Sequence, residues 1–293
     1  MARLDAGEPG LERKLMEQKL AVLGSPISHS KSPLIHSAAY RVLGLNWQYE
    51  KLEVRKGGLR PFMDGLDSSW RGLSLTMPLK EEAAKFAESL DEAAQITQAV
   101  NTLSRTGSGW AGYNTDVFGI CQAVRLASLG QIKTVLIIGS GATATSAMVA
   151  VSRVAPDAQV KVLARNPKTR AELISLAKSL GLNAGKTAGL TRAAKWADLT
   201  IATLPGGALN DAAAKLAKKN SFLPGGAILD VAYQPWPSSI ASVWHQAGKP
   251  IISGLEMLLW QAVAQIRIFT NGDANEPLAN EVAVVEAMRH SLD

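Results

Sequence analysis

The chain has 293 residues, of which 31 are Lys or Arg and 25 are Asp or Glu, giving a formal net charge of +6. Hydrophobic residues make up 47% and charged residues 19%, which is typical of a folded globular protein and excludes a disordered one. The basic residues form no dense arm, and no apolar run approaches the roughly 20 residues of a membrane span. We therefore expect neither a nucleic-acid nor a membrane partner.

The first 16 residues are polar, with no helix or strand periodicity and no apolar core of a secretory signal. We expect them to form a disordered leader, with Met16 as an alternative start to Met1. Cys121 is the single cysteine, which excludes an internal disulfide and fits a reducing, cytoplasmic location. The four histidines have no metal-ligand spacing, so no metal site is expected.

Residues 24–33, Gly-Ser-Pro-Ile-Ser-His-Ser-Lys-Ser-Pro, form the first notable loop. It joins a predicted strand at 20–23 to a predicted helix at 34–43. Ser30 and Ser32 are two apart, so both hydroxyls would point the same way in an extended segment. Near a helix N-terminus they could bind a small carboxylate. An ordinary capping turn is the alternative interpretation.

Strands and helices go on alternating up to about residue 117. The predicted strands cover 47–54, 72–76, 99–104 and 109–113, and the predicted helices cover 59–66 and 80–86. This pattern predicts a mainly parallel sheet covered by helices. Lys80 stands at a helix start, while Asn101 and Asp116 follow short strands, where side chains project toward a cleft. Asp116 could pair with Lys80, but turn-forming residues and an exposed ion pair are the alternative.

A second unit of the same kind follows. Its predicted strands cover 134–138, 159–163, 198–202 and 226–231, and its predicted helices cover 117–129, 144–153 and 169–180. Two last helices, predicted at 255–271 and 281–292, have no strand after them. The sequence therefore predicts two α/β domains with a boundary near residue 117.

A dinucleotide motif opens the second unit. It reads G-x-G-x-x-A directly after an apolar strand, and its residues are Gly139, Ser140, Gly141, Ala142, Thr143 and Ala144. The first glycine suits the tight turn, the second lets the backbone approach a pyrophosphate, and the last small residue allows close helix packing. A merely tight strand–helix turn is the alternative. Thr203 and Leu204 end a later strand and could lie under the nicotinamide half.

The end of the next strand favours NADP(H) over NAD(H). Arg165, Lys168 and Arg170 lie there, and no carboxylate precedes Glu172. An NAD site usually carries an acid at this corner, whereas cations would pair with a 2′-phosphate. A solvated basic loop is the alternative.

Together these pieces resemble the shikimate dehydrogenase family from about residue 20 onward. The matching segments share their order and spacing with that family: Gly24 with 30–33, 75–80, 99–102, 114–116, 139–144, and 254–258 with Gln261. Departures are Ser74 for an asparagine, Met77 for a valine, Ala142-Thr143 in the glycine-rich turn, Ala164-Arg165-Asn166 for Asn-Arg-Thr, and Ser253 for an aspartate.

The resemblance implies a fold and a division of labour. It implies an N-terminal, mainly parallel-sheet domain that binds substrate (17–116 plus 253–293) and a Rossmann-like NADP-binding domain (117–252). The C-terminal helices would return to the first domain. It also implies reversible reduction of 3-dehydroshikimate to shikimate with NADPH, in chorismate and aromatic amino-acid biosynthesis.

Site residues follow from the resemblance position by position. Ser30 and Ser32, helped by Tyr233, would bind the carboxylate, and Lys80 paired with Asp116 would act as general acid and base. The residues implied for the ring hydroxyls are Thr76, Asn101, Asp116 and Gln261. Those implied for the cofactor are 139–144, Arg165, Lys168, Thr203, Leu204, Gly254 and Met257.

Two rival functions stay open at this point. One is a quinate/shikimate dehydrogenase using NAD or NADP, and the other is a non-catalytic metabolite-binding protein. Either a monomer or a homodimer would be compatible with the sequence.

Overall fold

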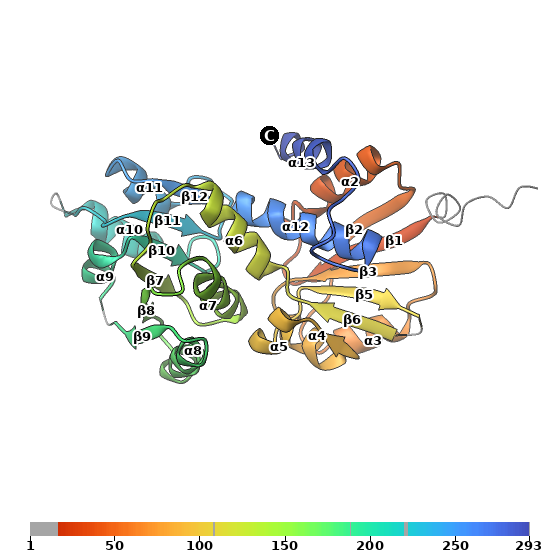
Figure 1. Cartoon of the computed structure of the whole chain (residues 1–293), viewed down its shortest axis with the longest axis horizontal. Coiled ribbons are helices and arrows are strands. Elements are labelled where there is room, and N and C mark those ends of the chain that lie inside the picture. Colours follow the sequence, from red (N-terminus) through yellow and green to blue (C-terminus); the bar gives the residue numbers. More distant parts are fainter. Residues whose placement is uncertain (1–16, 108, 188, 220–221, 293) are drawn as a thin grey trace, which may run out of the picture. The chain divides into compact units, whose positions relative to one another are not determined.

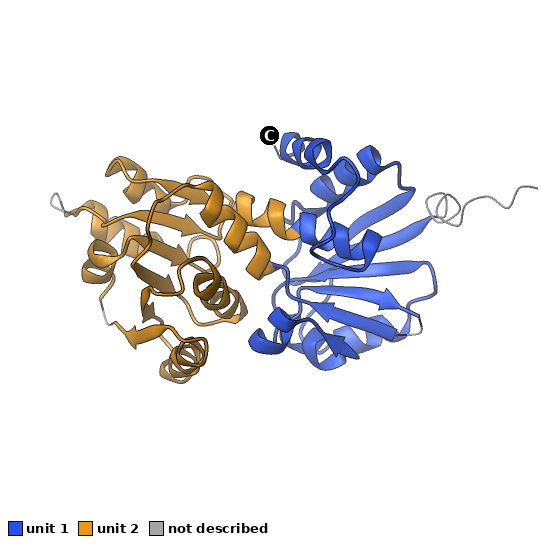
Figure 2. Cartoon of the chain, in the orientation of Figure 1, with its two compact units in different colours: residues 1–115, 262–293 blue, residues 116–261 orange. Residues whose placement is uncertain are grey.

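The computed structural model describes residues 17–107, 109–187, 189–219 and 222–292 (Figure 1). The chain forms two compact units, one made of residues 1–115 and 262–293 and the other of residues 116–261 (Figure 2). Within the described residues each unit contains one six-stranded sheet. Both are α/β units, as the alternating sequence pattern predicts.

The first unit, unit 1, has a mixed sheet in the order β2-β1-β3-β5-β6-β4. The strands β1, β2 and β3 are parallel, whereas β5 is antiparallel to both β3 and β6. The strands of unit 1 are β1 (Gln18–Gly24), β2 (Trp47–Glu53), β3 (Trp70–Leu75), β4 (Ser89–Leu90), β5 (Thr102–Thr106) and β6 (Gly109–Tyr113). Its helices are α2 (Ser32–Leu43), α3 (Leu59–Asp64), α4 (Lys80–Phe86), α5 (Glu92–Thr97), α13 (Glu281–His290) and the last ten residues of α12 (Gly254–Asn271).

Side-chain alternation in β3 explains how this sheet is covered. Leu73 and Leu75 belong to a buried core with residues of α3 and α4. Gly72 faces the other way, where an added Cβ would lie 2.3 Å from the ring of Phe269 in α12. Because alternate residues of a strand point to opposite faces, helices cover both sides of β3.

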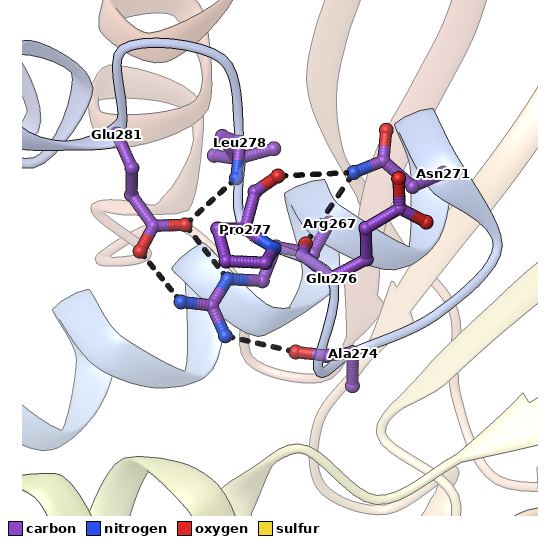
Figure 3. Close-up of polar contacts among 7 residues, drawn as sticks. All are labelled: Arg267, Asn271, Ala274, Glu276, Pro277, Leu278 and Glu281. Carbon is purple, nitrogen blue, oxygen red and sulfur yellow. Dashed lines mark hydrogen bonds and ion pairs between the residues drawn. The ribbon is translucent and has the colours of Figure 1, made fainter.

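A largely buried ion pair holds the loop between the C-terminal helices α12 and α13 in place. Arg267 in α12 donates to both carboxylate oxygens of Glu281 at the start of α13, at 2.6 and 2.7 Å (Figure 3). It also donates to the Ala274 carbonyl oxygen at 3.0 Å. The helix α13 then packs on α2, and the Lys31 ammonium donates to the Leu292 carbonyl oxygen at 3.1 Å. The C-terminal segment is thus tied to the loop that carries Ser30 and Ser32.

The second unit, unit 2, has a sheet in the order β12-β11-β10-β7-β8-β9, and its strand pairs are parallel. Taken along the chain this is the order 3-2-1-4-5-6 of a doubly wound dinucleotide-binding fold. The strands are β7 (Thr134–Ile138), β8 (Gln159–Leu163), β9 (Asn183–Lys186), β10 (Leu199–Ala202), β11 (Ala227–Asp230) and β12 (Ile251–Ser253). The helices are α6 (Asp116–Leu126), α7 (Ala142–Val154), α8 (Pro167–Ser179), α9 (Leu190–Trp196), α10 (Asn210–Ala217), α11 (Ser239–Gln246) and the first eight residues of α12.

The unit boundaries differ from the domain boundaries that the sequence suggests. The first change of unit falls between residues 115 and 116, one residue before the predicted one. The second falls inside α12, between 261 and 262, whereas the sequence places it at 253. The difference arises because α12 runs unbroken from one unit into the other, so no turn marks the change. The predicted leader, 1–16, lies outside the described residues.

Several short elements of the structure are not predicted by the sequence pattern. These are β4, α5, β9, α9, α10, α11 and β12, each of at most eight residues. Such segments are too short to show a clear hydrophobic period. None of the helices described is both long enough and apolar enough to cross a membrane.

Candidate active site

In unit 1, the loops after β1 and β3 are bound together at one edge of the sheet. The Thr76 N–H donates to the Leu23 carbonyl oxygen at 2.9 Å, and the Ser25 N–H donates to the Met77 carbonyl oxygen at 3.0 Å. A Cβ on Gly24 would lie 2.4 Å from Cγ2 of Thr76, so glycine is needed for this approach. The serine-rich loop therefore begins beside the segment that leads into α4.

Asn101 and Lys80 reach the same edge. Asn101 directly precedes β5, and its backbone accepts from the Leu75 N–H at 2.7 Å and donates to the Tyr113 carbonyl oxygen at 3.0 Å. Lys80 is the first residue of α4, and its carbonyl oxygen accepts from the Val100 N–H at 2.9 Å. The structure thus brings together the predicted residues Thr76, Lys80 and Asn101.

The serine pair has a different local geometry from the one expected. Lys31 has φ −90° and ψ −1°, in the helical region, and Ser32 is the first residue of α2. The Ser32 N–H donates to the Ser30 hydroxyl oxygen at 3.3 Å. The expected extended segment is therefore wrong, because a helix begins there. Ser30 accepts a bond at a helix start, which is part of the capping role, and both hydroxyls remain in one tight turn.

The side-chain amide of Asn101 is fixed by its neighbours. Its Oδ1 accepts from the Thr115 N–H at 2.9 Å and from the Thr102 hydroxyl at 2.8 Å, and its Nδ2 donates to the Thr115 hydroxyl at 2.9 Å. Because a backbone N–H can only donate, the atom that faces it must be the oxygen. The amide of Asn101 therefore has a single orientation.

A buried polar cluster in unit 1 surrounds His36. The His36 ring stacks on the Tyr49 ring with centroids 3.9 Å apart, and its Nδ1 lies 3.0 Å from the Tyr40 hydroxyl. Its Nε2 lies 3.2 Å from Oε1 of Gln265. The Tyr49 hydroxyl donates to the Ser74 hydroxyl at 2.6 Å. Burial raises the pKa of Tyr49 well above its usual value, so this hydroxyl stays a neutral donor.

His36 should make the folded protein sensitive to acid. Burial lowers its pKa from 6.5 to about 3, against a smaller raising effect of the Gln265 hydrogen bond. The unfolded state therefore binds one more proton between these two pH values, so stability that is complete above pH 6.5 falls as the pH drops toward 3. The slope from this group is at most about 1.4 kcal/mol per pH unit.

Urea unfolding of the wild type and of His36→Phe at several pH values would measure this contribution. Carboxylates add an acid slope to both proteins, so the difference between the two slopes belongs to His36. We expect the variant to be less stable at neutral pH, because Tyr40 and Gln265 lose a partner, but to lose less stability on acidification. Parallel curves for the two proteins would contradict the prediction.

In unit 2, the predicted dinucleotide turn has the expected form. Gly139 follows β7 with φ +119°, a conformation that favours glycine, and a Cβ there would lie 2.3 Å from the Thr203 hydroxyl oxygen. That hydroxyl donates to the Ile138 carbonyl oxygen at 2.9 Å. Leu204 packs on the same position, with Cδ2 at 3.3 Å. The segment after β10 is thus fitted closely to this turn.

Gly141, unlike Gly139, could be another residue as far as its backbone conformation and its packing are concerned. It has φ −92° and ψ −172°, which any residue adopts, and an added Cβ would meet no atom within 4 Å. Nothing in the protein therefore demands a glycine there. It immediately precedes the 13-residue helix α7 and gives it no side-chain cap. An open backbone at the start of a long helix fits a pyrophosphate, which binds to the first N–H groups.

The predicted 2′-phosphate cations lie around the start of α8. Arg165 and Lys168 are exposed, while Arg170 donates to the Ala164 carbonyl oxygen at 3.0 Å. Thr169 lies 2.7 Å, hydroxyl to hydroxyl, from Ser140 of the glycine-rich turn. That contact holds the basic segment beside the turn, so one dinucleotide could reach both.

Two helices of unit 2 carry three further predicted residues. A Cβ on Gly119 in α6 would lie 2.6 Å from the Met257 carbonyl oxygen and 3.0 Å from Cβ of Gln261 in α12. The two helices therefore meet at this glycine. Asp116, a buried residue, precedes Gly119 by three positions and lies on the same face of α6. Asp116, Met257 and Gln261 thus belong to one pair of packed helices.

Gly254 and Tyr233 follow the ends of β12 and β11. A Cβ on Gly254 would lie 2.2 Å from the Val231 carbonyl oxygen, so close packing by itself explains this glycine. Tyr233 is half-buried. It lies near Asp230, whose pKa burial raises and whose carboxylate accepts from the Ser238 hydroxyl at 2.6 Å.

Two residues of unit 1 were missed by reasoning from the sequence: His36 and Gln265 take part in the polar contacts around Asn101 but belong to no motif. Thr102 and Thr115 lie in the matched segments 99–102 and 114–116 but were given no role, although both bond to the Asn101 amide. One available signal was Gln265, a polar side chain four residues after Gln261 with only apolar residues, Ala-Val-Ala, between the two. Within the described ranges, no three His, Cys, Asp or Glu side chains are grouped so that they could hold a metal ion.

Comparison with known proteins finds similarity to shikimate dehydrogenases. A family model described as the shikimate dehydrogenase substrate binding domain matches residues 22–103. The shikimate dehydrogenase (NADP⁺) of Rubrobacter xylanophilus is 33% identical over 284 residues, covering 93% of this chain and 94% of its own.

Solved structures are similar over both units. Mycobacterium tuberculosis shikimate dehydrogenase is 36% identical with a TM-score of 0.80, covering 93% of this chain and 99% of its own. The shikimate 5-dehydrogenase of Thermus thermophilus, solved in complex with NADP(H) and shikimate, is 27% identical with a TM-score of 0.77, covering 94% and 99%.

Proposed function

Because the chain belongs to the shikimate dehydrogenase family, we propose that it reversibly reduces 3-dehydroshikimate to shikimate with NADPH, in the biosynthesis of chorismate and the aromatic amino acids. The observation that carries the proposal is the extent of the similarity. The relative from Rubrobacter xylanophilus matches over 93% of the chain, and the side chains proposed below for the reaction are present in this sequence.

We propose that the edge of unit 1 where β1 and β3 end binds the substrate. Ser30 and Ser32 would donate to the carboxylate from their tight turn at the start of α2. The residues proposed for the ring hydroxyls are Thr76, Asn101, Asp116 and Gln261. Tyr233 would supply one more hydroxyl donor for the carboxylate.

Lys80 is proposed to move the proton. In the reducing direction its ammonium donates to the ring oxygen that becomes an alkoxide, and in the oxidising direction its neutral amine accepts that proton. Asp116 would hold the Lys80 ammonium by charge pairing. Support comes from the position of Lys80 at the first residue of α4, beside Asn101 at the same edge of the sheet.

Unit 2 is proposed to bind the cofactor. When bound, NADP(H) supplies or accepts the hydride. The start of α7, opened by Gly141, would hold the pyrophosphate, and Arg165 and Lys168 would pair with the 2′-phosphate. Residues proposed to line the rest of the cofactor are Ser140, Ala142, Thr143, Ala144, Thr203, Leu204, Gly254 and Met257.

We further propose the functional division 17–116 with 253–293 for substrate and 117–252 for NADP(H). A cytoplasmic location is proposed from the single, buried Cys121, which needs no oxidising compartment. A monomer or a homodimer would suffice for this chemistry.

A spectrophotometric assay of NADP⁺ reduction with shikimate tests the function. We expect turnover with shikimate and NADP⁺, and much less with NAD⁺ or with quinate. Preference for quinate with NAD⁺ would point to a quinate dehydrogenase instead. Correctly folded protein that binds shikimate without turnover would favour a metabolite-binding role.

A further inference from the structure

Gln265 in α12 is a buried side chain that no part of the proposed reaction uses directly. It is 1% exposed, and both ends of its amide are engaged. Its Nε2 donates to the Asn101 carbonyl oxygen at 3.2 Å and to the Thr102 hydroxyl at 2.9 Å. Its Oε1 accepts from the Ser74 hydroxyl at 2.9 Å and lies 3.2 Å from Nε2 of His36. Four elements of unit 1 therefore meet at this one amide.

Elementary donor and acceptor chemistry fixes the orientation of that amide. The carbonyl oxygen of Asn101 can only accept, so the Gln265 atom facing it is the nitrogen. The oxygen then faces His36, whose Nε2 must carry the proton. Nδ1 of His36 is in turn the acceptor of the Tyr40 hydroxyl. This arrangement needs a neutral imidazole, which full burial provides.

The same chain of donors continues to Asn101. Thr102 accepts from Gln265 and donates its own proton to Oδ1 of Asn101 at 2.8 Å. Without the Gln265 donor, the Thr102 hydroxyl could rotate away. Asn101 is therefore held by Gln265 at two points, its carbonyl oxygen directly and its amide oxygen through Thr102.

We propose that Gln265 is a positioning residue that orients the Asn101 amide for substrate, acting through the Asn101 carbonyl and the Thr102 hydroxyl. The expected effect of Gln265 on the kinetics rests on the proposed function, whereas the orientation of the Asn101 amide by Gln265 does not. The ligand class is a ring hydroxyl of the proposed substrate. Gln265 touches neither substrate nor cofactor in this role, so its effect should be carried wholly by Asn101.

The first experiment is a double-mutant cycle in steady-state kinetics with shikimate and NADP⁺. Gln265→Met preserves the length and apolar volume of the side chain but removes both polar ends. We expect kcat/KM to fall about 10-fold, mainly through KM, the usual effect of one lost hydrogen bond to substrate. In an Asn101→Ala background the same change should lower kcat/KM by less than about twofold.

Thr102→Val provides a second variant, because it removes the link through the Thr102 hydroxyl with an isosteric side chain and leaves the direct contact of Gln265 with the Asn101 carbonyl oxygen. It should also lower kcat/KM, by no more than Gln265→Met does, and its effect should vanish in the Asn101→Ala background. Ile266→Val is the control, a change of a fully buried apolar side chain at the next position of α12. It should lower stability slightly and leave KM unchanged. Full additivity of Gln265→Met with Asn101→Ala, or an unchanged KM, would overturn the proposal.

A second measurement does not depend on the reaction. By ¹⁵N NMR, His36 should be the Nε2–H tautomer, and the side-chain NH₂ of Asn101 should exchange slowly with solvent. Gln265→Met should accelerate that exchange at least several-fold, whereas Ile266→Val should not. Unchanged exchange, or an Nδ1–H tautomer in the wild type, would overturn the orientation even if shikimate turnover is normal. If shikimate is not turned over, the proposed function fails but this measurement still decides the orientation.

Discussion

Replacing Lys80 by Met is expected to lower kcat for shikimate oxidation about 10²–10⁴-fold, the usual contribution of a positioned general acid or base. Methionine keeps most of the length of lysine but cannot carry a proton. The KM for shikimate should change much less, since other side chains are proposed to bind the carboxylate and the ring hydroxyls. Steady-state kinetics in both directions would measure the two constants.

Lys85→Met is the matched control for this experiment. Lys85 lies in the same short helix, α4, but in its last turn and exposed to solvent. Its replacement removes the same charge from the same helix and should leave kcat unchanged. Normal turnover by Lys80→Met would show that another group carries the proton.

Gly139→Ala is expected to reduce stability and cofactor binding together. Alanine would have to adopt the φ of +119° that Gly139 has, which lies in the left-handed region. Its Cβ would also lie 2.3 Å from the Thr203 hydroxyl oxygen. Strain of this kind costs about 1–3 kcal/mol, and the clash would add to it or displace the segment after β10. Thermal unfolding should show a lower Tm, and the stabilisation by added NADP⁺ should largely disappear.

Gly141→Ala is expected to weaken cofactor binding at the same turn without lowering the stability of the fold. Its backbone is open to any residue and its Cβ would meet nothing within 4 Å, so the Tm of the free protein should stay unchanged. The methyl group should nevertheless keep a pyrophosphate from approaching the backbone and raise the Kd for NADP⁺ about 10-fold or more. A lowered Tm with normal NADP⁺ binding would show that this glycine has a packing role instead.

The contrast between these two glycines shows what a motif can and cannot convey. The sequence predicted the strand at 134–138 and the turn after it, and β7 is found at Thr134–Ile138. It could not tell which glycine is required by the protein's own packing. That depends on Thr203, far along the chain, which reaches Gly139 only because β10 pairs with β7.

At Ser30 and Ser32 the structure differs from the local geometry that the sequence suggests. Their side chains were expected on one side of an extended segment, but Lys31 is helical and Ser30 accepts from the Ser32 N–H. A local pattern of hydroxyls near a helix start is compatible with either geometry. The structure shows where the helix begins, and it also shows that α2 packs on α13 near the other end of the chain.

By itself, the sequence determined the two α/β units, the dinucleotide turn and the family, because hydrophobic periods and short motifs are local properties of the chain. It did not determine the network around Gln265, which joins α2, β3, the start of β5 and α12. Only the tertiary structure decided that these polar groups meet, since each is satisfied by a partner far away in sequence. A buried hydrogen bond depends on three-dimensional distance, and sequence spacing carries no information about it.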